Sequence, residues 1–287
     1  MHWHARLCVA TVGSTCYVLI MTESSQPLRG SLGEILNYLH PRISSMPRRV
    51  PGEMILEGRP FRYVDLHSFY HQVVQIFGQK LYDFTAESDA PVIFDCGAHI
   101  GLATLALKQR YPKAHLTAFE ADPAISDVLR FNLNSFGLSD VVVRQQAVWV
   151  HDKGVIFEAS HDDSGKVQGT NAIPGTTTTA VPSVRLRALL EQAHVDFVKL
   201  DIEGAEFSVI PDCFDVLRKA RCYLVEAHVF DYPQRLGNLL SIFEGHGFRY
   251  VLGDLHQATW MPVDGAQPPF TQCPSDKFIV SIFAWRV

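Results

Sequence analysis

The sequence predicts an α/β fold whose core is a mostly parallel, doubly wound sheet. From about residue 90 onward, short apolar runs alternate with amphipathic segments of helical period, which is the pattern of strands joined by crossover helices. Several apolar runs end in polar clusters, and the densest is "VDFVKLDIEGAE" at 195–206. Because ligands bind beyond the carboxyl ends of strands in open α/β sheets, these clusters predict a site there.

Composition narrows the classes of function. The chain has 287 residues, of which 47% are hydrophobic and 19% charged, so it has the content of a globular protein with a large core. A net charge of −5 argues against nucleic acid as the partner. Six cysteines stand singly without a CxxC pair, which is typical of reduced thiols in a cytoplasmic protein. The mildly apolar stretch 7–21 is too short to span a bilayer, so no membrane partner is expected.

Three segments are predicted along the chain. Residues 1–30 are expected to be a flexible leader. Residues 31–85 are expected to form an N-terminal helical cap, because "SLGEILNYL" and "SFYHQVVQIFGQKLYDF" are amphipathic with helical spacing. Residues 86–287 are expected to form the main domain.

The first half of that domain alternates clearly. "APVIFDCGAHIG" (90–101) is predicted to be a buried strand that leads into a tight turn and then into a helix, which Pro112 ends. "HLTAFEADP" (115–123) is the second strand. Asp122 and Pro123 then have the residue types of an N-cap and of the first helical position. "VVVRQQAVWV" (141–150) is predicted to be the third strand.

The second half completes a seven-stranded sheet. The Gly-, Ser- and Thr-rich stretch 159–182 is predicted to be a surface excursion, such as a hairpin or lid. "VDFVKLDIEG" and "CYLVEAHVF" are the fourth and fifth strands, with helical patterns before the fourth and after the fifth. "FRYVLGD" and "KFIVSIFAWRV" supply the last two. The connection between them has little helical periodicity, so the final strand is predicted to be antiparallel.

The turn after the first strand, "DCGAHIG", has the form DxGxxxG and not the GxGxxG of a dinucleotide site. Gly97 and Gly101 let a ligand approach the backbone closely. An acidic residue here, Asp95, suits a ligand that carries an ammonium group and no phosphate. An ordinary tight turn is the alternative.

Glu120 ends the second strand, 25 residues after Asp95 (120 − 95). A carboxylate at that point of an α/β sheet accepts hydrogen bonds from ribose hydroxyls. A solvated carboxylate at a strand end is the alternative. An NAD site would need this acid and the phosphate-binding glycines together, so the two features favour S-adenosylmethionine (SAM) as the cofactor.

These motifs resemble the FkbM family of SAM-dependent methyltransferases. "FDCGAHIGLAT", "FEADP", "QAVW" and above all "VDFVKLDIEGAE" carry the resemblance, which covers roughly 75–230. It implies a Rossmann-like SAM methyltransferase fold with a seven-stranded, mostly parallel sheet and an antiparallel last strand. It further implies O-methylation.

The resemblance also implies roles for individual residues. Asp95, Gly97 and Gly101 would shape the site of the methionine part of SAM, Glu120 would hold the ribose, and Ala147 would lie near the adenine. Four further residues are assigned to the same cofactor site, namely His99, Ala121, Gln146 and Asp201. The chain departs from the family pattern at His99, where a small polar residue such as Asn is usual, and in "LRALL" and "EADP".

The acids near the fourth and fifth strands suggest a catalytic role. A hydroxyl acceptor loses a proton on methylation, so a base within hydrogen-bond reach helps. The candidates are Asp201, Glu203, Glu206, Glu226 and His228, of which His228 is attractive because imidazole titrates near neutrality. Alternatively, Asp201, Glu226 or His228 could hold a divalent metal such as Mg²⁺ that binds the acceptor oxygen. For Glu206 a structural role at a helix start is the better interpretation.

The sequence therefore predicts an O-methyltransferase that acts on a hydroxyl of a small-molecule metabolite or a sugar. The alternatives are a methyltransferase for a peptide carboxylate or an amine, and a SAM-binding protein without catalysis. "DIEG" stands where base-modifying N-methyltransferases usually carry a [DN]PP[YF] motif, which disfavours nucleic-acid bases. The acceptor and the oligomeric state do not follow from the residues.

Overall fold

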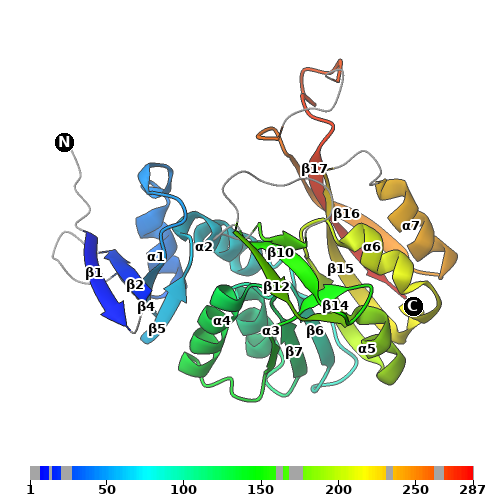
Figure 1. The fold of residues 1–287 in the computed structure, drawn as a ribbon, viewed down its shortest axis with the longest axis horizontal. Coiled ribbons are helices and arrows are strands. Elements are labelled where there is room, and N and C mark those ends of the chain that lie inside the picture. Colours follow the sequence, from blue (N-terminus) through cyan, green and yellow to red (C-terminus); the bar gives the residue numbers. More distant parts are fainter. Residues whose placement is uncertain are drawn as a thin grey trace.

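A computed structural model describes residues 7–12, 15–20, 28–159, 164–167, 177–230, 235–261 and 268–286. Its centre is a seven-stranded sheet of order β16-β17-β15-β14-β6-β7-β8 (Figure 1). The strands are β6 (Val92–Cys96), β7 (His115–Phe119), β8 (Val142–Arg144), β14 (Val195–Leu200), β15 (Ala220–Val229), β16 (Arg249–Gln257) and β17 (Phe278–Trp285).

The strand directions confirm the predicted sheet. β8, β7, β6, β14 and β15 run parallel to one another. The last strand, β17, lies between β15 and β16 and is antiparallel to both. Lys199 is opposite Asp95 in the register of β14 and β6. The two strands therefore end side by side, and the turns that follow them lie at one edge of the sheet.

Helices cover both faces of the sheet, as expected of a doubly wound fold. They are α3 (Leu102–Arg110), α4 (Pro123–Ser135), α5 (Leu186–Gln192), α6 (Glu206–Asp212) and α7 (Leu236–Gly245), with the 3₁₀ turn η3 (Phe214–Lys219). One face packs against α3 and α4 through Ile93 and Phe197. The other packs against α5, α6 and α7 through Phe94 and Val198. Side chains of β6 and β14 thus alternate between two hydrophobic cores.

The start of α4 follows the prediction from its sequence. The side chain of Asp122 accepts hydrogen bonds from the backbone N–H groups of Ala124 and Ile125, at 2.8 and 3.3 Å, and Pro123 is the first helical residue. These bonds satisfy N–H groups that have no partner inside the helix. α4 is therefore held at the end of β7, directly beside the strand end that carries Glu120.

The N-terminal part contains more strand than the sequence suggested. Its helices are α1 (Leu32–Leu39), η1 (Ile43–Ser45), α2 (Leu66–Val73) and the π-helical η2 (Val74–Gly78). Its strands are β1 (Leu7–Val12), β2 (Thr15–Ile20), β3 (Arg29–Gly30), β4 (Gly52–Leu56) and β5 (Arg59–Tyr63).

Two expectations for this part are therefore corrected. The segment 31–85 contains helices, but also the antiparallel hairpin β4–β5, so it is not a purely helical cap. The described residues of the expected leader, 7–12 and 15–20, form the β1–β2 hairpin, and the rest of 1–27 lies outside the described residues. The sequence carries little sign of the β4–β5 hairpin, because β5 is only five residues long. Its Phe61 and Tyr63, which stand on either side of Arg62, are buried. The division into domains at residues 30 and 85 stays a prediction.

A small sheet covers one side of the site. β10 (Val155–Ala159) pairs with β11 (Lys166–Val167) and β12 (Thr177–Val181), and the last two strands lie within the predicted surface excursion of 159–182. The predicted third strand is split into β8 and β9 (Ala147–Trp149), and β9 pairs with β13 (Ser183–Arg185) instead of with β7. Gln146, whose backbone N–H bonds back to Arg144, lies at this break.

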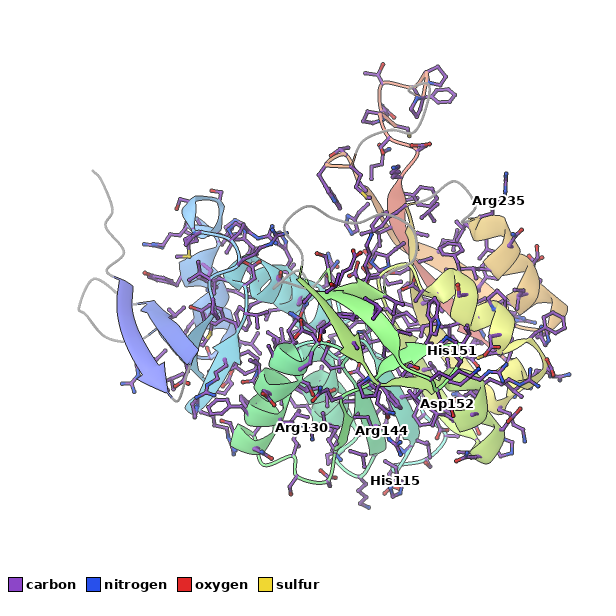
Figure 2. The ribbon with its side chains drawn as sticks, in the orientation of Figure 1. His115, Arg130, Arg144, His151, Asp152 and Arg235 are labelled. Carbon is purple, nitrogen blue, oxygen red and sulfur yellow. The ribbon has the colours of Figure 1, made fainter. Side chains whose placement is uncertain are left out.

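The two edges of the main sheet differ. His115, the first residue of β7, lies at the lower rim in Figure 2 and marks the amino ends of the parallel strands. The carboxyl ends face the opposite way, toward α2 and the β10–β12 sheet (Figure 1). No helix in the described parts of the chain is long and apolar enough to cross a membrane.

Candidate active site

A cavity of about 830 Å³ opens at the carboxyl ends of the parallel strands. Most of the residues predicted for the site line it, namely Gly97, His99, Glu120, Ala121, Gln146, Ala147, Asp201, Glu226 and His228. Two predicted residues, Asp95 and Gly101, do not line it. The structure thus brings together in one space residues that are far apart in sequence.

The turn after β6 requires glycine. Gly97 has a φ of +81°, and a Cβ built there would lie 1.8 Å from the backbone oxygen of Asp201. The backbone N–H groups of Gly97 and Ala98 donate to the carbonyl of Phe119, at 3.0 and 2.9 Å. The turn is therefore pressed between β7 and β14, and only a residue without a side chain fits.

Asp95 lies beneath this turn. Its side chain is fully buried, and its Oδ2 accepts a hydrogen bond of 2.6 Å from the hydroxyl of Thr104 in α3. Its Oδ1 has no hydrogen-bond donor, although the ammonium group of Lys199 stands 3.5 Å away. Gly101, with a φ of +95°, begins α3 and packs on Leu129. Both predicted residues therefore shape the turn from below.

Glu120 forms the second side of the cavity. Its Oε2 accepts from the backbone N–H of His99 and its Oε1 from that of Asp122, at 2.8 and 2.9 Å. Burial raises the pKa of Glu120 to about 7, against the opposing effect of these two hydrogen bonds. Each oxygen keeps a lone pair after one bond, so the carboxylate can still accept from a ligand's hydroxyl groups.

His99 connects the N-terminal part to the site. Its backbone has a φ of +48°, which is uncommon for a residue with a side chain. Its ring Nδ1 lies 2.9 and 3.2 Å from the side-chain nitrogen and oxygen of Gln72 in α2. Both residues line the cavity. The position where the chain departs from the family pattern is thus an anchor for α2.

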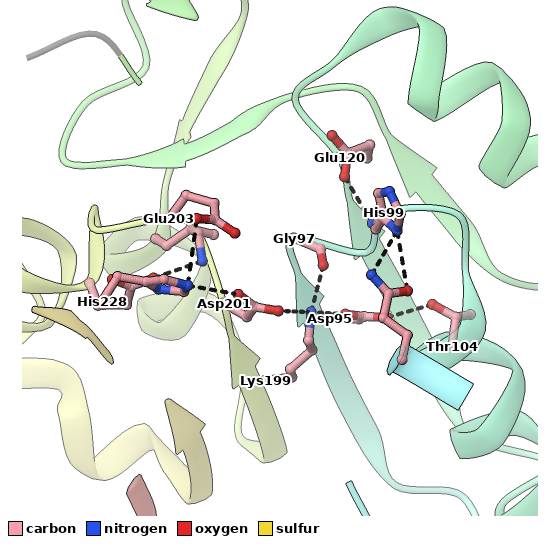
Figure 3. Close-up of polar contacts among 12 residues, drawn as sticks. Asp95, Gly97, His99, Thr104, Glu120, Lys199, Asp201, Glu203 and His228 are labelled. Carbon is pink, nitrogen blue, oxygen red and sulfur yellow. Dashed lines mark hydrogen bonds and ion pairs between the residues drawn. The ribbon is translucent and has the colours of Figure 1, made fainter. Parts of the chain in front are cut away.

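The end of β14 carries Asp201. Its side chain is 24% exposed, and its Oδ2 is 3.2 Å from the ammonium group of Lys199. Its Oδ1 stands 4.0 Å from Nε2 of His228 on β15 (Figure 3). Asp201 therefore faces the cavity between two groups that can carry positive charge.

His228 lies among carboxylates. Its Nε2 is 3.5 Å from Glu203, and its Nδ1 is 3.3 Å from Oε1 of Glu206. Burial alone would lower the pKa of His228, but Glu203, Glu206 and Asp201 outweigh it and hold the pKa well above its ordinary value. The surrounding carboxylates therefore favour the protonated form of His228, and the role of His228 as the base stays a prediction.

Glu206 has the structural role that the sequence suggested. Its side chain is fully buried and accepts hydrogen bonds from the backbone N–H groups of Ile202 and Gly204, at 2.8 and 2.9 Å. These bonds close the turn in which Glu203 adopts a φ of +57°. The turn directs the partly exposed carboxylates of Asp201 and Glu203 toward His228.

Glu226 is the third candidate acid, on β15 two residues before His228. Burial and the neighbouring charge of Asp201 raise its pKa to about 8, while His228 and Lys199 act in the opposite direction. The group thus changes its charge close to neutral pH. A carboxyl group poised in this range can take up or give a proton during a reaction.

This pKa shift predicts how the stability of the ligand-free protein depends on pH. The folded pKa of Glu226, about 8, lies above the ordinary 4.5, so the folded protein binds the proton more tightly than the unfolded chain. The resulting stability is full below pH 4.5 and is lost as the pH rises through about 8. We expect the melting temperature to fall between about pH 5 and 8, and to fall less steeply in Glu226→Gln.

The melting temperature over that pH range, measured for both proteins, checks this. Glu120 and His228 have raised pKa values too, so the slope should shrink and not vanish. Parallel curves for the two proteins would contradict the assigned environment of Glu226.

One group among the described residues has the spacing of metal ligands. Asp201, Glu203 and His228 each offer one ligand atom, and these atoms all lie within 4.8 Å of one another. Glu226, named in the sequence-based alternative, is not in this group. The carboxylates of this set are ligand types that Mg²⁺ takes, and a hard cation prefers oxygen ligands to imidazole.

Several residues of the cavity were not predicted. No motif in the sequence singled out Lys199, Gln72, Phe157, Trp260 or Lys277, and all five line the cavity. Lys199 lies on β14, and the other four come from α2, β10 and the connection between β16 and β17. Without a recognisable motif, a residue's place in such a segment depends on tertiary packing. The one signal in the sequence was the unusual residue His99, which indicated that its surroundings differ from those in the family. That signal did not identify Gln72 as its partner.

The strand order, the glycine turn and the acid at the end of β7 together define a Rossmann-like methyltransferase fold. The model of the methyltransferase FkbM domain matches residues 95–250, more than half of the chain. The chain belongs to this family, which is one of SAM-dependent methyltransferases. The match begins at Asp95 and includes Glu120, the "DIEG" turn and His228.

Two curated proteins are similar to about half of this chain. "Methyltransferase sdnD" of Sordaria araneosa is 28% identical over 169 residues, 47% of this chain. "Methyltransferase 1" of Beauveria bassiana is 26% identical over 164 residues, 50% of this chain. The alignment spans 65% of the length of each of these curated relatives.

Solved structures resemble the chain more distantly. A methyltransferase FkbM from Methylobacillus flagellatus is 16% identical, with a TM-score of 0.43 over 76% of this chain and 53% of that one. A precorrin-6y C5,15-methyltransferase from Geobacter metallireducens is also 16% identical, with a TM-score of 0.41 over 75% of this chain and 87% of that one.

Proposed function

We propose that this chain is an O-methyltransferase that moves the methyl group of SAM to a hydroxyl of a small-molecule metabolite or a sugar. The observation that supports it is the shared cavity, whose one side has the glycine turn and Glu120 and whose other side has Asp201, Glu226 and His228. A donor site and a set of proton-handling groups within one cavity are what methyl transfer to a hydroxyl needs.

The residues present fit SAM. Gly97 lets the turn pack closely against the backbone of Asp201 at the cavity surface, and buried Asp95 lies below the turn with an oxygen that lacks a hydrogen-bond donor. Glu120 has acceptor capacity for two ribose hydroxyls, and Ala147 gives a small apolar surface for the adenine. When bound, SAM supplies an electrophilic methyl group on a sulfonium. The chain's own residues orient the partners and handle the proton of the acceptor.

Asp201 is the residue we assign as the base that takes this proton. It lies at the cavity surface and is held by Lys199 on one side. Protonated His228 stands on its other side, where it can orient the carboxylate and balance its charge. Glu226, with a pKa of about 8, is a second group that can exchange a proton with the acceptor.

The apolar lining of the cavity suits a compact organic acceptor. Phe230, Met261 and Ile279 contribute apolar surface, and Trp260, which is 69% exposed, also lines the cavity. Apolar walls around a few polar groups are typical of small-molecule sites. The net charge of −5 remains an argument against a nucleic-acid acceptor.

The experiment that tests the proposal supplies methyl-labelled SAM and purified protein to a metabolite extract that lacks this protein. We expect label in a product whose new methyl group is attached to an oxygen that was a hydroxyl, identified by mass spectrometry and NMR. Label on an amine or a carboxylate would replace the proposal with one of the alternatives. SAM binding without any labelled product in extracts that contain hydroxylated metabolites would favour a non-catalytic protein.

The same reaction tests whether turnover needs a divalent metal. We propose that Asp201 acts without one, because Lys199 and His228 already stand beside its carboxylate. Thorough chelation with EDTA should therefore leave turnover within about twofold of the untreated enzyme. A loss of activity that added Mg²⁺ restores would instead assign the group of Asp201, Glu203 and His228 to a metal.

A further inference from the structure

Lys199 is a buried cation at the centre of the site. It lies on β14, only 3% of its side chain is exposed, and its ammonium group donates a 2.5 Å hydrogen bond to the carbonyl of Gly97. The same nitrogen is 3.2 Å from Oδ2 of Asp201 and 3.5 Å from Oδ1 of Asp95 (Figure 3). One side chain thus joins the turn after β6 to the acid after β14.

The charges around Lys199 fix it in place. The ring of Tyr82 lies 5.5 Å from the ammonium group, a distance at which a cation and an aromatic face attract each other. Burial alone would lower the pKa of Lys199, but Asp201, Tyr82 and Asp95 outweigh it and raise the pKa well above its ordinary value. The ammonium group therefore stays charged, and its position is determined by the two carboxylates and the carbonyl.

We infer that Lys199 is a positioning residue for methyl transfer, which holds the cofactor turn at Gly97 and the carboxylate of Asp201 in one fixed relation. This inference rests on the proposed function. Without the ammonium group, the carboxylates of Asp95 and Asp201 would repel each other in a buried place, and the carbonyl of Gly97 would lose its donor. The turn and the base would then shift independently.

The chain contains a matched control. Lys108 at the end of α3 is buried to the same degree, with 1% of its side chain exposed. Its ammonium group donates to the carbonyls of Pro112 and Ala114 and to the carboxylate of Asp140, at 2.7, 3.1 and 2.7 Å. Lys108 does not line the cavity. Its replacement removes a buried cation of similar bonding without touching the site.

The experiment compares Lys199→Met with Lys108→Met. Both should lower the melting temperature, because each leaves buried acceptors without a donor. Only Lys199→Met should reduce kcat, by about 100-fold, as expected for a misplaced reacting group. It should also weaken SAM binding by about 10-fold in calorimetry, because the turn at Gly97 loses its support. Lys108→Met should keep kcat and the Kd for SAM within about threefold of the wild type.

The outcomes separate the inference from the proposed function. If the wild type methylates a hydroxyl and the two Met variants have equal kcat and Kd, the inference is wrong and the function stands. If the wild type binds SAM but transfers no methyl group, the function is wrong, and the calorimetric comparison alone decides on Lys199. Should Lys199→Met not fold, the double variant Lys199→Met/Asp201→Asn, measured against Asp201→Asn, replaces it. Equal SAM affinity of those two proteins would overturn the inference.

Discussion

Replacing Gly97 by Ala is expected to remove SAM binding. The added Cβ would lie 1.8 Å from the backbone oxygen of Asp201, which cannot move without displacing the end of β14. A φ of +81° also strains any residue with a side chain, by roughly 1–2 kcal/mol. The turn must shift by more than an ångström, so we expect at least about a 100-fold loss of SAM affinity and a comparable loss of turnover. Calorimetry with SAM and a kinetic assay measure the two effects.

Gly247 supplies the control for backbone strain. Its φ of +75° is close to that of Gly97, but a Cβ there meets no atom within 4 Å. Gly247→Ala should lower stability by about 1–2 kcal/mol and leave SAM binding unchanged. If Gly97→Ala bound SAM as well as Gly247→Ala does, the close contact between the two strand ends would have no part in cofactor binding.

Replacing Asp201 by Asn should abolish most turnover and spare the cofactor. The substitution keeps the shape of the side chain, and the backbone N–H still donates to the carbonyl of Cys96 at 3.2 Å. It removes the carboxylate that we assign as the base, which is worth about 10²–10⁴ in rate. We expect kcat to fall by about 1000-fold, with the Kd for SAM within about threefold of the wild type.

Asp212→Asn is the companion variant. Asp212 pairs with Arg185 at 2.6 Å and does not line the cavity, so its replacement changes the same functional group outside the site. Its kcat should match that of the wild type. Unchanged turnover in Asp201→Asn would remove Asp201 from the chemistry and leave Glu226 as the candidate base.

Local rules were enough to predict much of the sheet and its helices. The N-cap at Asp122 and the apolar run of β14 are encoded by a few adjacent residues, and such signals do not depend on the rest of the fold. The break between β8 and β9 could not be predicted, because it depends on pairing with β13, a segment 36 residues away (183 − 147). The hairpin β4–β5 was missed because α4 covers one face of a short run that has weak periodicity on its own.

The site residues that belong to sequence motifs could be predicted, and those outside any motif could not. Gly97, Glu120 and Asp201 stand directly at strand ends, so the topology alone brings them to one cavity. The state of His228 could not be predicted, because its pKa depends on Glu203 and Glu206, which approach it only in the folded chain. The apolar lining at Trp260 and Met261 belongs to a connection with no motif, and its place follows from tertiary packing alone.

The central claim is that the rim of Gly97 and Glu120 holds SAM and not a dinucleotide. The most direct test is calorimetric titration of the unmodified chain with SAM and, separately, with NAD, repeated on Glu120→Ala. We predict one SAM bound per chain, no heat from NAD, and an affinity for SAM at least about 10-fold weaker in the variant, which loses the carboxylate that accepts from the ribose. Binding of NAD, or SAM affinity that does not respond to Glu120, would contradict this account.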